Sequence, residues 1–112
     1  MSADLPAIDV QKARDLAGGN LELAHELFTL LRQELMSVRE SLQSLNFPAA
    51  VGVLADNAHK LRSSARYCAA SRLETAAEKA ERAAMVSDAI AESRRELLLA
   101  VDEILAMADP YL

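Results

Sequence analysis

Apolar residues recur every three or four positions between Asn20 and about Leu45, and this spacing constrains the fold more than any other feature of the chain. It is the spacing of one face of an α-helix, so it predicts a long amphipathic helix. The apolar stripe consists of Ala24, Leu27, Phe28, Leu31, Leu35, Val38 and Leu42. Such a stripe must be buried against other elements, so the rest of the chain has to supply them.

A shorter helix is expected before this long one. Asp9 suits a helix N-cap, and the helix should continue to about Ala17, where Gly18 and Gly19 end it. Asn20 then suits the N-cap of the long helix.

A third helix is expected from Pro48 to about Tyr67. Proline suits the first position of a helix and disfavours helical geometry in the residue before it, so the chain should break at Asn46 and Phe47. The apolar stripe predicted for this helix is formed by Val51, Leu54, Ala58, Leu61, Ala65 and Cys68.

Two further helices complete the chain. The sequence SRLE at Ser71–Glu74 has the spacing of a capping box and should start the fourth helix. Ser87 or Asp88 should start the last helix, and Asp109 and Pro110 should end it. The inner face of the fourth helix is predicted to contain Leu73, Ala76, Ala77, Ala80 and Ala84.

Short connections place successive helices side by side in opposite directions. The predicted fold class is therefore all-α, an antiparallel up-and-down four-helix bundle with a short extra N-terminal helix. The 112 residues should form a single domain over 1–112, and a monomer, because the four apolar stripes can satisfy one another. An extended coiled-coil pair would need unbroken heptads, which Pro48 interrupts.

Composition argues against several classes of function. A net charge of −5, from 17 acidic and 12 basic residues, repels a polyanion, so nucleic acid is not an expected partner. The single cysteine, Cys68, continues a core stripe, cannot form an internal disulfide and indicates a reducing compartment. The sequence shows no leader, membrane span, Walker loop or kinase glycine-rich signature, so we expect a cytosolic chain that does not itself bind ATP.

The stretch NAHKLRSSARYC, residues 57–68, places His59 in an unusual setting. At about 100° per residue, His59 lies roughly 130° from the centre of its helix's apolar stripe and should point to solvent. Asp56 and Arg62 lie about 60° to either side of it. Within about 40° of the same direction lie Gly52, Ala55, Ser63 and Arg66.

An exposed imidazole in this setting suits nucleophilic attack on phosphorus. A neutral ring nitrogen can take up a phosphoryl group as a phosphoramidate and release it again. Arg62, Arg66 and Lys60 can attract and neutralise the incoming dianion, and the small residues around the ring leave room for a partner's active site. On spacing alone, an ordinary surface histidine explains His59 equally well.

A longer pattern resembles a known family. The segment HKLRSSARYCAASRLETAAEKAERA is similar to the signature of histidine-containing phosphotransfer (HPt) domains, and the upstream LAGGNLELAHELFTLL looks like the start of such a domain. The resemblance implies that His59 is the phosphoacceptor and that Arg62 is the basic residue assisting it. It also implies that Ser63 and Ser64 occupy the Gly-Ser positions of the signature, with Ser63 standing where the family usually has glycine.

The same resemblance implies the partners. Receiver domains would deliver the phosphoryl group to His59 and take it away, each bringing its own aspartate and the Mg²⁺ bound near it, while this chain would hold no metal or cofactor. They would dock on the exposed faces of the second and third helices. The residues expected at this docking surface are Gly52, Ala55, Asp56, Lys60, Ser63, Ser64 and Arg66.

The segment ARYCAASRL narrows the resemblance further. It is most similar to the carboxy-terminal HPt domain of tripartite hybrid sensor kinases of the GacS/BarA type. This resemblance implies a cytoplasmic domain, either freestanding or part of a membrane-anchored sensor kinase.

Two other functions compete with phosphotransfer. A helical adaptor with the HPt fold would bind receivers or kinases without transferring phosphate, and Ser63 in place of glycine favours it. The pairs Glu22–His25 and Asp56–His59 have the acid-x-x-His spacing of di-iron bundles, but both histidines lie well off their apolar stripes, whereas ligands in such bundles point inward. His25 lacks a basic surround and is expected to be an ordinary surface residue.

Overall fold

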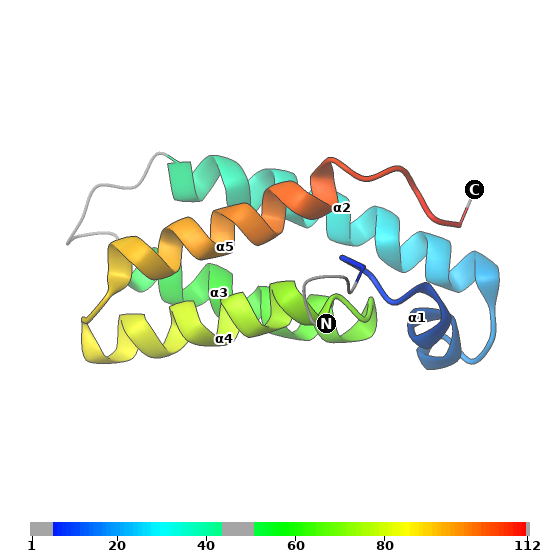
Figure 1. Cartoon of the computed structure of the whole chain (residues 1–112), viewed down its shortest axis with the longest axis horizontal. Helices are drawn as coiled ribbons and strands as arrows, with labels where there is room; N and C mark the ends of the chain where they lie inside the picture. Colours follow the sequence, from blue (N-terminus) through cyan, green and yellow to red (C-terminus); the bar gives the residue numbers. More distant parts are fainter. Residues whose placement is uncertain (1–5, 44–50, 112) are drawn as a thin grey trace.

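The computed structural model describes residues 6–43 and 51–111, and within these ranges it contains five α-helices and no β-strand (Figure 1). The predicted all-α class is confirmed. The break expected at Asn46 and Phe47, the helix end near Leu45 and the helix start at Pro48 lie outside the described residues. The helices are α1 (Val10–Leu16), α2 (Leu21–Gln43), α3 (Val51–Tyr67), α4 (Ser71–Val86) and α5 (Ile90–Leu105).

The caps predicted for α1 and α2 are confirmed. The side chain of Asp9 accepts a hydrogen bond from the backbone N–H of Lys12 at 3.0 Å, and Asn20 accepts one from the N–H of Leu23 at 3.0 Å. Gly18 and Gly19, which end α1, have φ angles of 72° and 79°. Residues with a side chain rarely adopt such left-handed angles, whereas glycine adopts them readily, so glycine suits both positions of this turn.

The fourth helix begins at Ser71 as predicted, but the capping box predicted at Ser71–Glu74 is wrong. The N-cap of α4 is Ala70, which makes no side-chain cap bond, and Ser71 is already helical. The reason lies in the end of α3: Ala69 takes a left-handed φ of 55°, and the N–H of Ala70 bonds to the carbonyl of Ala65 at 2.8 Å. This tight, buried turn uses Ala69 and Ala70 to end one helix and begin the next, so no residue is left to act as a side-chain cap.

The boundaries predicted for the last helix are also wrong. Ser87, with φ 52°, ends α4, and Ala89, also at φ 52°, is the N-cap of α5. The helix ends at Leu105, whose carbonyl accepts a hydrogen bond from the guanidinium of Arg32 at 3.4 Å. Asp109 lies beyond the helix and accepts a hydrogen bond from the Tyr111 N–H.

The four long helices pack around a single core. α3 packs against α4, α4 against α5, α5 against α2 and α2 against α3, while α1 rests on α2. In Figure 1, α3 and α4 lie side by side below α2 and α5. No helix within residues 6–43 and 51–111 is long and apolar enough to cross a membrane.

The predicted stripes form that core. Every predicted stripe residue of α2 is buried except Leu27, which is half-buried, and in α3 only Val51 is not fully buried. α4 contributes mainly alanines to the core, and these small side chains let α3 approach closely. Polar side chains on the adjoining edges of the two helices can therefore form hydrogen bonds with each other. The buried residues of α4 are Leu73, Ala77, Ala80, Ala83 and Ala84, and the buried apolar residues of α5 are Leu97, Val101 and Ile104.

We predict that the thiol of Cys68 is unreactive in the folded protein. Only 5% of the residue is exposed, and burial, with a smaller effect of Glu34, raises the pKa of the thiol to about 11 from its ordinary value of 9.0. The thiolate that reacts with iodoacetamide is therefore scarce near pH 8. Mass spectrometry should show slow alkylation of the native chain and rapid alkylation in denaturant; equal rates would contradict the burial.

Folding raises the pKa of the Cys68 thiol, so the free energy of unfolding depends on pH. The contribution of the protonated thiol to this free energy is fully present below about pH 9 and is lost as the pH rises toward 11.

Candidate functional site

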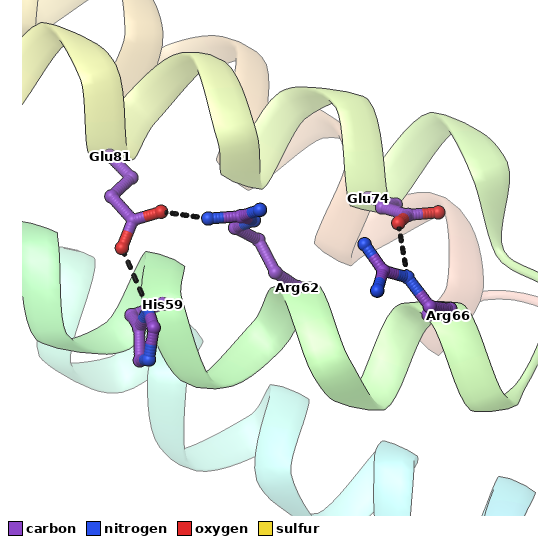
Figure 2. A network of polar contacts seen from close by, with 5 residues as sticks. All are labelled: His59, Arg62, Arg66, Glu74 and Glu81. Carbon is purple, nitrogen blue, oxygen red and sulfur yellow. Dashed lines mark hydrogen bonds and ion pairs between the residues drawn. The ribbon is translucent and has the colours of Figure 1, made fainter.

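His59 lies near the middle of α3, with its side chain directed away from the core (Figure 2). Its neighbours Ala58 and Leu61 are completely buried and fix the rotation of the helix. The imidazole itself is 73% exposed, which confirms the predicted direction. A partner molecule can therefore reach the ring without any rearrangement of the bundle.

A carboxylate that the sequence analysis did not identify holds the ring from α4. Oε2 of Glu81 lies 2.8 Å from Nδ1 of His59 (Figure 2). The Glu81 side chain is only 19% exposed, so it is held between the two helices. The sequence carries no signal for this contact, because the register of α3 against α4 is set by packing.

Arg62 binds the other oxygen of the same carboxylate. Its guanidinium donates from Nη1 to Oε1 of Glu81 at 2.5 Å, so Glu81 bridges the imidazole and the guanidinium (Figure 2). The hydrogen bond from Arg62 is the largest cause of a lowered pKa at Glu81; partial burial opposes it and the hydrogen bond with His59 adds to it. In turn, Glu81 raises the pKa of Arg62. Glu81 is therefore an ionised carboxylate at neutral pH.

The ionised carboxylate determines which nitrogen of the ring is free. A carboxylate only accepts hydrogen bonds, so Nδ1 of His59 must carry the proton that it donates to Glu81. In the neutral ring, Nε2 then keeps its lone pair. Nε2 points away from Glu81 and α4 (Figure 2), on the open side of an exposed ring. The arrangement provides one nucleophilic nitrogen with a fixed direction.

Two of the other residues expected at the site are engaged elsewhere. Arg66 donates from Nε to Oε2 of Glu74 on α4 at 2.9 Å, about one turn beyond the Arg62 pair (Figure 2). Ser64 faces α2, where its hydroxyl donates to Oε2 of Glu34 at 2.7 Å. Arg66 and Ser64 therefore stabilise the contacts of α3 with α4 and α2.

The remaining expected residues surround the ring on an open surface. Ala55 is half-buried, and the others, Gly52, Asp56, Lys60 and Ser63, are exposed. A Cβ added to Gly52 would meet nothing within 4 Å, so the surface has free space at that position. The ammonium group of Lys60 takes part in no ion pair within the part of the chain that the structure describes.

His25 differs from the prediction of an ordinary surface residue. Its Nδ1 lies 2.8 Å from Oδ2 of Asp109, and its side chain is 37% exposed. The pair connects α2 to the segment after α5, beside the edge-to-face contact of Phe28 with Tyr111. Neither His25 nor His59 belongs to a group of three or more His, Cys, Asp or Glu residues able to hold a metal ion within residues 6–43 and 51–111.

Comparison with known proteins identifies the family. The Hpt domain family model matches residues 21–109, which include the four long helices and the whole site around His59. Neither the search of curated proteins nor the search of solved structures found a significant match. The chain belongs to the Hpt domain family, whose members transfer phosphoryl groups through a histidine in two-component signalling and interact with receiver domains.

We predict that Arg62→Ala raises the pKa of Glu81, because it removes the largest cause of the lowered value. NMR titration of the Glu81 side-chain carboxyl carbon measures this directly. Arg66→Ala, which breaks the neighbouring pair with Glu74, is the matched control and should leave the titration of Glu81 unchanged. An identical Glu81 titration in the wild type and Arg62→Ala would contradict the described bridge.

The same shift has a consequence for stability. Folding lowers the pKa of Glu81, so this carboxylate favours the folded state above its ordinary value of 4.5. The contribution is lost as the pH falls through the lowered pKa. It should be small, because Arg62 remains accessible to water.

Proposed function

We propose that His59 is a phosphorelay intermediate that accepts a phosphoryl group from a receiver-domain aspartate and passes it to the receiver of a response regulator. The observation that carries this proposal is the geometry of the ring. Nδ1 is held by Glu81 at 2.8 Å, and the imidazole that bears the free Nε2 is 73% exposed. A nucleophile for a macromolecular donor has to be both directed and accessible.

In the transfer step, the lone pair of Nε2 attacks the phosphorus of the aspartyl phosphate. The N–P bond forms, the P–O bond breaks, and the receiver's carboxylate leaves with the electron pair. The ring keeps its Nδ1 proton and becomes cationic beside the ionised Glu81, so no proton has to leave His59. Transfer onward is the reverse of this step with a second receiver.

The charges around the ring suit a dianionic group. Glu81 alone would stabilise the cationic ring but would also repel the phosphoryl oxygens. Arg62, bound to the same carboxylate, offsets its charge, and this is the stabilising role that we propose for Arg62. The Mg²⁺ that phosphotransfer requires would be held by the receiver, beside its own aspartate.

We further propose that residues 1–112 form one monomeric domain, an up-and-down antiparallel four-helix bundle with a short N-terminal helix. The ion pairs between α4 and α5 support this topology, because partners later in α4 pair with residues earlier in α5. Examples are Arg72 with Glu103 and Lys79 with Glu96, between α4 and α5. The similarity of ARYCAASRL supports a cytoplasmic role as the HPt domain of a hybrid sensor kinase of the GacS/BarA type.

An adaptor that binds receivers without transferring phosphate is the second candidate. The observation that favours it is the exposed side chain of Ser63, one helical turn from His59, where the family usually has glycine. The side chain of Ser63 projects back toward the imidazole and into the space that a receiver must enter.

Labelling by a phosphorylated receiver tests the proposed function. His59→Gln should abolish the label, whereas His25→Gln, the matched control, should retain it. The label should be lost in acid and stable in base, as a phosphoramidate is. Receiver binding without any label would support the adaptor, and an acid-stable label on a hydroxyl group would overturn the assignment of His59.

Substitutions at Ser63 test the direction of approach. Ser63→Gly should transfer phosphate at an equal or higher rate, with a loss of about 0.5 kcal/mol of stability from the lower helix propensity of glycine. Ser63→Leu should leave the helical circular dichroism spectrum intact but block transfer, because a bulky side chain obstructs access to His59. Transfer by Ser63→Leu at the wild-type rate would show that receivers do not approach across this face.

A further inference from the structure

A pocket lies next to Arg62 and Glu81, the two residues that are linked to His59. It has a volume of about 300 Å³ and lies between α3 and α4. Two of its lining residues, Arg62 and Glu81, are the residues that hold the imidazole. The full lining is Arg62, Glu78, Glu81, Arg82 and Met85.

Met85 is the apolar member of this pocket, and it is unusually exposed. It is 80% accessible, more than any other large hydrophobic residue in the described ranges. Glu78, Glu81, Arg82 and Met85 have the spacing i, i+3, i+4 and i+7, so they share one face of α4. The folded chain leaves this methionine in water, directly beside polar groups that belong to the site.

The pocket is close enough to His59 to lie within the surface that a docked partner buries. Met85 is one helical turn, about 6 Å along the axis, from Glu81, which touches the ring. A specific protein interface buries about 800 Å² on each partner, a patch of roughly 16 Å radius if it is circular. Any partner centred on Nε2 of His59 therefore reaches α4 as well as α3.

The composition of this surface fits a protein interface. Met85 provides an apolar centre, and a polar rim surrounds it, as in protein interfaces in general. Arg82 takes part in no ion pair within residues 6–43 and 51–111, so its charge is available to a partner. Methionine also adapts its shape to different surfaces, which suits a site that has to receive one receiver as donor and another as acceptor.

We propose that a receiver domain docked on His59 inserts an apolar side chain against Met85 in this pocket, so that α4 contributes to receiver binding together with α3. This inference rests on the proposed function and extends the docking surface beyond the second and third helices. The polar rim formed by Glu78 and Arg82 fixes the orientation of the docked receiver, while Met85 provides the apolar contact.

Met85→Glu in the full chain tests the proposal, with Leu99→Glu on α5 as the matched control, because Leu99 is also exposed and apolar but lies outside the α3–α4 surface. The measurement is the rate of His59 labelling against the concentration of a phosphorylated receiver. Met85→Glu should raise the half-maximal receiver concentration about tenfold or more. Leu99→Glu should change it less than about twofold, and thermal melts should show both variants folded.

Equal changes of the half-maximal receiver concentration in Met85→Glu and Leu99→Glu would overturn the proposal. So would a wild-type chain that is dimeric by light scattering and becomes monomeric in Met85→Glu, since the occupant would then be a second copy of this chain. If no receiver labels wild-type His59, the proposed function fails, and calorimetric binding of the unphosphorylated receiver becomes the readout for Met85. Unchanged binding by Met85→Glu would then reject the docking site independently of phosphotransfer.

Discussion

The bridge that Glu81 makes between His59 and Arg62 is the interaction on which the chemistry of this domain depends. One oxygen of the carboxylate lies 2.8 Å from Nδ1 of the imidazole, and the other accepts a hydrogen bond from the guanidinium. A histidine that is 73% exposed would otherwise rotate freely and exchange its proton between both nitrogens. The bridge gives the ring one orientation and one tautomer without burying it.

Small residues in the core between α3 and α4 make this bridge possible. Ala58 and Ala65 of α3 and Ala77 and Ala80 of α4 are completely buried. With side chains of this size at the contact, the backbones of α3 and α4 approach closely. Glu81, on the edge of α4 that faces α3, then lies within hydrogen-bonding distance of His59 and Arg62. The same edge carries the pair of Arg66 with Glu74, which Figure 2 shows along the same two helices. The core therefore sets the geometry of the surface site.

The sequence predicted the parts of this arrangement that depend on one helix at a time. The spacing of apolar residues depends only on the sequence within one helix. It correctly predicted that the stripes of α2 and α3 are buried and that His59 is exposed. Glu81 could not be found in this way, because it lies 22 positions from His59 on another helix and only the packing register brings the two together. The pairing of His25 with Asp109 was missed for the same reason.

The errors at the helix ends have a different physical cause. The chain takes left-handed angles at Ala69, Ser87 and Ala89, where glycine would be the usual signal. Sequence patterns therefore assigned the cap of α4 and the start of α5 to polar residues, whereas the N-caps in the structure are Ala70 and Ala89. These turns lie away from His59, so the errors do not affect the prediction of the site.

The tautomer of His59 is the most direct test of this account, and the ¹⁵N chemical shifts of its two ring nitrogens report it at a pH where the ring is neutral. The bridge from Glu81 predicts a proton on Nδ1 and a bare Nε2. It also predicts that Glu81→Gln weakens this preference, because an amide can donate a hydrogen bond to Nδ1 as well as accept one. A wild-type ring with its proton on Nε2, or shared equally between the two nitrogens, would contradict the claim that Glu81 directs the nucleophile.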